Sequence, residues 1–258
     1  MRTNDRSTER SMKNLATGSR ISERSSDVAG GAIADQMNSD IKGMESAKRN
    51  AEAAQSFASV AEGALNEQNN IMTRMRELSV QAASDNFSSK ERGMMDGEYK
   101  ELKSELDRIA KTTRFGSQKI LDGSVQELDF QVGTTSGQES RISYKSNSNT
   151  TGSELGIDGL SVESKEDARD SLESLDRAMD TIGNTRAKFG ALQSRLDSAQ
   201  NNLATQVENT SAARSQIADA DLAKETTDVR RGQIIQQYQV AMLQEANNQT
   251  GLALRLIG

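Results

Sequence analysis

The 258-residue chain contains no cysteine, histidine, proline or tryptophan. Without cysteine and histidine it lacks the commonest zinc ligands, the usual general base near neutral pH, thiol catalysis and every disulfide. We therefore expect no enzyme activity, no metal site and no cofactor. An average chain of this length has roughly a dozen prolines, so their absence favours long helices, which proline would kink.

Hydrophobic residues make up 34% of the chain and aromatic residues only 3%, while charged residues reach 27%. This is little apolar material for a compact globule, so an elongated bundle or an assembly with partners fits better. The net charge of −6 argues against nucleic-acid binding. No apolar run approaches the roughly 18 residues of a membrane span, so we expect no membrane insertion. The polar opening has no secretory apolar core, so work outside the cell requires another export route.

The strongest heptad pattern predicts a helix from about Met37 to Ala83. A second apolar row flanks the seam and makes the stripe wide enough to contact more than one neighbouring helix. At about 1.5 Å per residue such a helix is roughly 70 Å long. The seam consists of Met44, Ala47, Ala51, Ala54, Ala58, Ala61, Leu65, Gln68, Met72, Met75, Ser79 and Ala82, and the second row of Phe57, Ala64, Ile71 and Leu78.

A shorter helix is expected from about Lys90 to Thr112, with an apolar face of Met94, Leu102, Leu106 and Ile109. The loop before it, residues 84–89, offers serine and aspartate side chains that can cap this helix, so the two helices are predicted to be antiparallel neighbours. The region that follows is rich in Gly, Ser, Thr and Asn. Two alternating runs in it, Leu128–Val132 and Ile142–Tyr144, predict one small β-hairpin at about residues 126–145.

A second long helix is predicted from near Glu163, with a heptad interruption between Arg186 and Leu192 that changes supercoiling without ending the helix. A bend is expected within residues 212–221. The last segment has apolar residues on nearly all sides, so in an isolated copy we expect it to fray and to become ordered on assembly. The apolar residues of this segment are Ile234, Ile235, Tyr238, Ala241, Met242, Leu243, Ala246, Leu252, Leu254, Leu256 and Ile257.

Several ordered blocks at both ends resemble the bacterial flagellins, the subunits of the swimming filament. The likeness covers about residues 15–123 and 163–258. Residues 28–33 depart from the family pattern, and the N-terminal helix looks shorter than in relatives. The matching blocks are Asn14–Ser22, Ser25–Met37, Arg74–Ala82, Phe115–Gly123, Arg214–Glu225, Gln233–Gln237 and Leu252–Gly258.

The resemblance implies a mainly α fold, an elongated antiparallel helical coiled-coil bundle with one small β-hairpin region. Residues 1–36 would form the N-terminal part of the inner, filament-core domain and a spoke region. Residues 37–215 would form a middle helical rod domain, and residues 216–258 the C-terminal helix of the inner domain. The family's outer variable domains would be missing, since only about residues 124–162 stand in their place.

The function implied by the resemblance is a structural subunit that self-assembles into the extracellular flagellar filament for swimming motility. Implied partners are copies of itself or sister flagellins, an export chaperone, the type III export apparatus, filament cap and junction proteins, and an animal Toll-like receptor. Two alternatives are a hook–filament junction protein and, in a different class, a signalling coiled coil of the chemoreceptor type. The second alternative predicts no hairpin and a tail that is already helical in the monomer.

The family's receptor-recognition residues match Arg74, Leu78 and Glu98 in this chain. Arg74 and Leu78 are four residues apart on one helix and would form a charged and apolar patch that also suits subunit packing. Glu98 has the simpler alternative of a surface ion pair worth under about 1 kcal/mol. Subunit or chaperone contacts are expected at Ile234, Ile235, Tyr238, Met242, Leu243, Leu254 and Leu256, whose alternative role is the core of a monomeric bundle.

The acidic residues Asp219, Asp221 and Glu225 are close together in the sequence and raise the question of a metal site or an acid–base pair. They lack the spacing and the central glycine of a calcium loop. Helix capping and solvation are the preferred interpretation.

Overall fold

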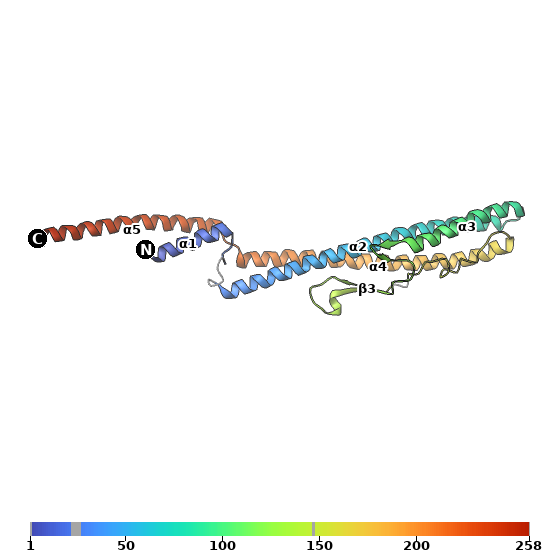
Figure 1. Cartoon of the computed structure of the whole chain (residues 1–258), viewed down its shortest axis with the longest axis horizontal. Coiled ribbons are helices and arrows are strands. Elements are labelled where there is room, and N and C mark those ends of the chain that lie inside the picture. The colour runs from blue at the N-terminus through green and yellow to red at the C-terminus, as the bar shows by residue number, and fades with distance from the viewer. Residues whose placement is uncertain (1, 22–26, 146–147, 258) are drawn as a thin grey trace. The chain divides into compact units, whose positions relative to one another are not determined.

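The computed structural model describes the backbone of residues 2–21, 27–145 and 148–257, and the side chains of residues 3–21, 27–145 and 148–246. Helices dominate these residues, which confirms the mainly α class (Figure 1). The helices are α1 (Arg2–Thr17), α2 (Val28–Ala82), α3 (Ser89–Thr112), α4 (Lys165–Ala218) and α5 (Leu222–Ile257). The strands are β1 (Arg114–Phe115), β2 (Gln118–Lys119), β3 (Glu127–Gln131) and β4 (Arg141–Lys145), with a 3₁₀ turn at Gln138–Ser140.

The chain divides into two compact units. The central unit comprises Gly43–Thr205 and contains α3, all four strands and most of α2 and α4. The terminal unit comprises Met1–Lys42 and Gln206–Gly258 and contains α1, α5, the start of α2 and the end of α4.

The central unit is an antiparallel three-helix bundle, because contacts between its helices run in opposite sequence directions. Between α2 and α4, Glu62 accepts a hydrogen bond from Gln193 (3.0 Å), while Arg76 bonds Asp176 (2.8 Å). Between α2 and α3, the side chain of Gln68 donates to the carbonyl of Leu106 (3.2 Å), while Arg74 donates to Glu98 (2.9 Å). All twelve predicted seam positions of α2 are buried, which confirms that stripe. In the second row Phe57 and Leu78 are buried, and Ala64 and Ile71 are half-buried.

Helix α3 begins at a capping box: the hydroxyl of Ser88 accepts from the backbone of Glu91, and the Glu91 carboxylate accepts from the backbone of Ser88. The backbone amides of Ser88 and Glu91, which have no partner within the helix, are thereby hydrogen-bonded. This confirms the prediction that the loop caps the helix. Leu106 is buried and Leu102 and Ile109 are half-buried, but the prediction is wrong for Met94, whose side chain is 63% exposed. The neighbouring methionine and a tyrosine pack inward instead, in the heptad series Met95, Tyr99, Leu102, Leu106 and Ile109.

The predicted hairpin is present: β3 and β4 pair antiparallel, with Leu128 opposite Tyr144 and Phe130 opposite Ile142. A second antiparallel pair, β1–β2, was not predicted. Its two-residue turn begins at Gly116, which has φ +60°, a conformation that favours glycine. Both pairs bring rings to one cluster, in which Phe57 lies 5.9–6.2 Å from the rings of Phe115, Phe130 and Phe189, and Tyr144 lies 4.8 Å from Phe189.

Helix α4 continues through residues 186–192 without a break, as the heptad interruption predicts. The bend expected within residues 212–221 covers fewer residues than predicted. Helix α4 continues to Ala218 and α5 begins at Leu222, so only residues 219–221 separate them. The carboxylate of Asp221 accepts hydrogen bonds from the amides of Ala223 (2.9 Å) and Lys224 (3.1 Å). Asp221 is therefore the predicted cap of α5.

A buried carboxylate on α3, Asp96, holds the irregular segment that leads into α4. It accepts hydrogen bonds from the hydroxyl of Ser161 (2.9 Å) and the amide of Val162 (3.0 Å), and it pairs with Lys100 (2.5 Å). Burial opposes ionisation of this carboxyl, but the bonds from Lys100, Val162 and Ser161 outweigh it and lower its pKa.

Replacement of Asp96 by asparagine is expected to destabilise the folded chain by about 1–3 kcal/mol at pH 7, because the charged acceptor is lost. Since the folded pKa is lowered, the carboxylate stabilises the fold above its unfolded pKa of about 4, and this contribution disappears as pH falls through the folded value. Denaturant unfolding at pH 7 and below pH 4 should therefore show the difference between parent and variant shrinking in acid. Asp176→Asn, which removes an exposed ion pair, is the control with a small effect.

Candidate functional site

The contact between α1 and α5 is made largely by small and polar side chains. Asn4 donates to the carbonyl of Gly232 (2.9 Å), and Asn14 donates to the carboxylate of Glu225 (2.9 Å). The two helices are therefore antiparallel. Ser11 and Asn14 of α1 are buried, and hydrogen bonds from Asn14 and Ser11 lower the pKa of Glu225.

The same ends of the helices are also joined through the backbone. The amide of Arg20 donates to the carbonyl of Ala218 (2.8 Å), and the amide of Ala220 donates to the carbonyl of Gly18 (2.9 Å). The hydroxyl of Ser19 donates to the carbonyl of Ala218 (3.0 Å). The segment after α1 is thus fastened to the α4–α5 connection, which fixes the register of α1 along α5.

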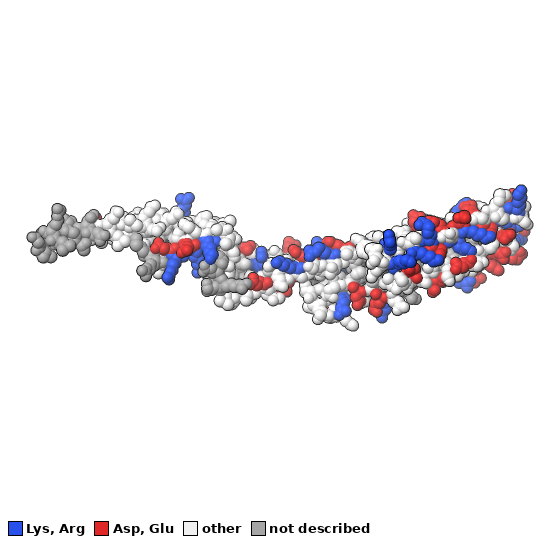
Figure 2. All heavy atoms as spheres, in the orientation of Figure 1, with Lys and Arg blue, Asp and Glu red and all other residues white. Residues whose placement is uncertain are grey.

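The large apolar side chains of α5 are exposed. Tyr238 and Met242 are 71% and 70% exposed, and Ile234, Ile235 and Leu243 are also open to solvent. No charged residue occurs between Arg231 and Glu245. On the face shown in Figure 2, α5 carries few charged atoms before the grey residues, whereas acidic and basic side chains alternate over the helices of the central unit.

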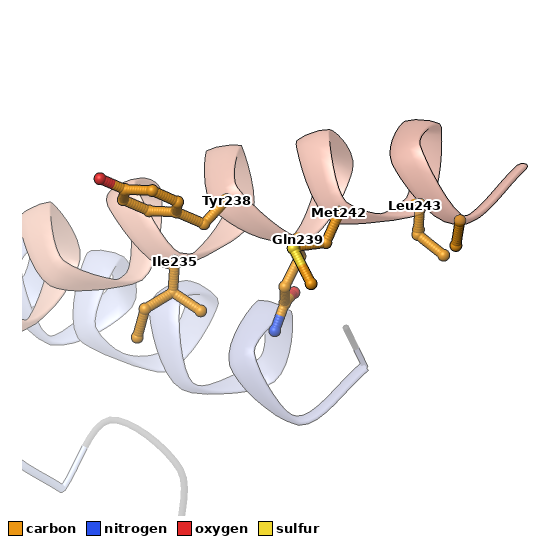
Figure 3. Close-up of a pocket in the computed structure, with 6 residues that line it drawn as sticks. Ile235, Tyr238, Gln239, Met242 and Leu243 are labelled. Atoms are coloured by element: carbon orange, nitrogen blue, oxygen red, sulfur yellow. The ribbon is translucent and has the colours of Figure 1, made fainter. Parts of the chain in front are cut away.

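Part of this exposed set lines a groove of about 660 Å³ formed by Ile235, Tyr238, Gln239, Met242, Leu243 and Ala246. Figure 3 shows Ile235, Gln239 and Met242 directed to one side of α5. We call Ile234, Ile235, Tyr238, Met242 and Leu243 the α5 apolar surface. Its exposure rules out the alternative that these five side chains form the core of the monomer. The predicted contact residues Leu254 and Leu256 have side chains outside the described residues.

The three matched receptor residues have different environments. The guanidinium of Arg74 pairs with the carboxylates of Glu98 (2.8 Å) and Glu77 (3.0 Å), and all three side chains are about half exposed. Glu98 is thus in the surface ion pair that was its simpler alternative. Leu78 is 2% exposed and belongs to the core, so the expected patch of Arg74 with an exposed Leu78 is wrong. The heptad row that contains Leu78 faces inward between helices.

The acidic residues near the α4–α5 connection do not form a metal site. Asp221 caps α5, Glu225 bonds Asn14, and Asp219 forms an isolated bridge with Ser19. Among the described residues no group of acidic side chains is arranged to hold a metal ion. No helix among them is long and apolar enough to cross a membrane.

Replacement of Gly232 by alanine is expected to weaken the α1–α5 contact by about 1–3 kcal/mol through overpacking. A Cβ atom there would overlap the Thr8 hydroxyl and lie 3.2 Å from the Thr8 Cβ. Hydrogen exchange of α1 amides should become faster, although alanine is the better helix former. The additional change Thr8→Ala should restore most of the protection. Equal exchange in the parent and the Gly232→Ala chain would contradict this account.

Comparison with known proteins identifies the family. The model of the bacterial flagellin N-terminal helical region matches residues 1–126, and that of the flagellin C-terminal helical region matches residues 172–257. The chain belongs to the bacterial flagellins. The flagellin of Halalkalibacterium halodurans is 32% identical, over 96% of this chain and 91% of the relative. Flagellin FlaB2 of Treponema pallidum is 33% identical, over 97% and 92%.

A solved flagellin has a similar fold. The crystal structure of Bacillus cereus flagellin is 30% identical and superposes with a TM-score of 0.54, over 64% of this chain and 94% of that chain. The resemblance inferred from the sequence blocks is thereby confirmed, and the α5 apolar surface lies within the matched C-terminal region of this flagellin.

Proposed function

We propose that this flagellin is a structural subunit of the bacterial flagellar filament and that its α5 apolar surface is buried between subunits. The observation that carries the proposal is the inverted polarity of the α1–α5 pair. Its internal contact includes the polar residues Asn4, Ser11, Asn14 and Glu225, while the five large side chains of the α5 apolar surface are exposed. Helix pairs that fold alone place apolar residues inside, so this arrangement favours burial by other subunits.

The type of contact between subunits determines whether they form a closed ring or an open filament. An apolar helix face that contacts a different surface on the next copy makes a heterologous contact, and such contacts produce an open helical polymer when they do not close into a ring. Residues 1–36 and 216–258 are proposed as the filament-core domain and residues 37–215 as the middle helical domain. Rotation of the polymer outside the cell then supports swimming.

The remaining partners are proposed from the family. The chain passes through the type III export apparatus unfolded, and the absence of cysteine means that no disulfide has to be reduced on the way. An export chaperone covers the α5 apolar surface before secretion, and filament cap and junction proteins meet the subunit at the ends of the filament. A Toll-like receptor of animals recognises the region of Arg74 and Glu98. The buried Leu78 supports that region from within the core.

Sedimentation and electron microscopy of the purified full chain test the proposed function. The chain is incubated alone and with sonicated filament fragments, and elongation of fragments or formation of filaments is the expected result. Hydrogen exchange of the free chain and of the pelleted polymer should show faster exchange in α5 of the free chain. A free chain whose α5 amides are protected throughout, and which never elongates fragments, would favour the soluble signalling coiled coil.

A further inference from the structure

Methionine is the sole sulfur-containing side chain of this flagellin, since it has ten methionines and no cysteine. The described methionines range from buried to exposed, with Met37, Met95 and Met179 half-buried. Met44, Met72 and Met75 are buried in the central unit, where a peroxide in solution does not reach the thioether. Met12, Met94 and Met242 are exposed. Thioether oxidation follows exposure, so these three are the sites that a solution oxidant reaches first among the described side chains.

Met242 differs from the other two in its surroundings. It lines the apolar groove of α5 beside Ile235 and Leu243, within a stretch free of charged residues. Figure 3 shows its sulfur turned toward the side of α5 on which Ile235 and Gln239 also lie. Met94 is similarly exposed but lies on the outer face of α3, next to the polar side chains of Lys90 and Glu98 one turn away along the helix.

We propose that Met242 is an oxidation site that controls whether a free subunit can join a filament; the inference rests on the proposed role of the α5 apolar surface. The oxidant class is a peroxide. The thioether sulfur attacks one peroxide oxygen, an S–O bond forms and the O–O bond breaks. The sulfur loses two electrons to give the sulfoxide, and the other oxygen leaves as water after proton transfer.

The consequence follows from polarity. A sulfoxide is far more polar than a thioether, and Ile235, Leu243 and Ala246 beside it offer no hydrogen-bond donor. The Tyr238 hydroxyl and the Gln239 amide are the donors of the same groove, and they would be buried together with the sulfoxide. Burial of this polar group in an apolar contact between subunits weakens association by roughly tenfold to a hundredfold. In an assembled filament the same sulfur is covered, so oxidation acts on free subunits and spares the polymer. The change is reversible by methionine sulfoxide reductases, which distinguishes it from permanent damage.

The experiment compares the full chain with four variants, Met242→Leu, Met242→Gln, Met94→Leu and Met94→Gln. Leucine keeps an apolar side chain of similar size without the sulfur, and glutamine imitates the polarity of the sulfoxide. Each chain is treated as a monomer with hydrogen peroxide, peptide mass spectrometry measures oxidation at each methionine, and circular dichroism checks that helix content is unchanged. Sedimentation then gives the minimum concentration for elongation of filament fragments.

Treated parent and treated Met94→Leu are expected to need roughly tenfold or more higher concentration than untreated chain, while treated Met242→Leu elongates normally. Untreated Met242→Gln should be impaired and untreated Met94→Gln should not. Incubation with methionine sulfoxide reductases should restore the treated parent. Equal elongation by treated and untreated parent, with Met242 fully oxidised, would overturn this inference alone. Failure of the untreated parent to elongate fragments would overturn both the inference and the proposed function.

Discussion

A flagellin in which Tyr238 is replaced by aspartate should fail to elongate filament fragments at concentrations at which the parent does so readily. Tyr238 is the most exposed large apolar residue of the α5 apolar surface, at 71%. In the proposed filament an aspartate there would place an unpaired charge in an apolar contact. The effect on association is expected to exceed about 3 kcal/mol, which is more than a hundredfold in concentration.

Gln244→Asp is the matched control for this change. It introduces the same charge on the same helix, at a polar position six residues further along the chain and about 120° from Tyr238 around the helix axis. Both variants should have the same helix content and the same stability of the central unit, measured by circular dichroism and denaturant unfolding. Equal loss of elongation in both would mean that added charge, and not burial of Tyr238, is responsible.

Removal of the Phe189 ring should cause the largest loss of fold stability among single core truncations of the aromatic cluster. Phe189 is fully buried on α4, and its ring contacts Tyr144 of β4 and Phe57 of α2. Phe189→Ala removes ring contacts to two elements at once and leaves a cavity, so we expect a loss of about 3–5 kcal/mol in the free energy of unfolding. Denaturant unfolding monitored by far-ultraviolet circular dichroism measures it.

Phe115→Ala is the matched control, because it also removes a phenylalanine ring, but one at the edge of the cluster. Phe115 is 37% exposed and contacts Phe57 edge to face at 5.9 Å. Because part of this ring already meets water, the expected loss is smaller, about 1–2 kcal/mol. The result that matters is the difference in free energy of unfolding between the two variants. Similar losses would indicate that the stability of the central unit does not depend on the contact between Phe189 of α4 and Tyr144 of β4.

The α2 stripe could be read from the sequence because its periodicity is long and regular. Over twelve seam positions even the polar residues Gln68 and Ser79 are buried, since the heptad repeat fixes their direction. Gln68 is satisfied there in part by donating to the carbonyls of Leu106 and Thr150. Spacing also predicted the hairpin β3–β4 and the cap at Asp221, because these depend on residues close together in sequence.

The misplaced or missed features have identifiable physical causes. On α3 the adjacent Met94 and Met95 both look apolar, and only the heptad series through Tyr99 shows that Met95 faces inward. The pair β1–β2 is too short for a period-two signal, although the glycine after Phe115 marks its turn. The composition of α1 is polar on most sides, so periodicity gave no helix there, and its pairing with α5 depends on hydrogen bonds from Asn4 and Asn14.

The candidate site was partly predictable for the same reasons. An apolar segment without charges from Gly232 to Gln244 indicates a partner surface, and the five described members of the predicted set are exposed as that interpretation requires. Sequence similarity at Leu78 did not reveal its burial, because accessibility depends on how α2 packs against its neighbours. The ion pair of Arg74 with Glu98 joins two helices and likewise needs tertiary structure.

The three tyrosines give this flagellin a built-in optical label, since there is no tryptophan to mask them. Tyr99 and Tyr144 are buried in the central unit, and Tyr238 alone is open to water. Solvent-perturbation difference spectra of the free chain therefore report one residue, and quenching of its emission by acrylamide would follow polymer growth in real time without any attached dye.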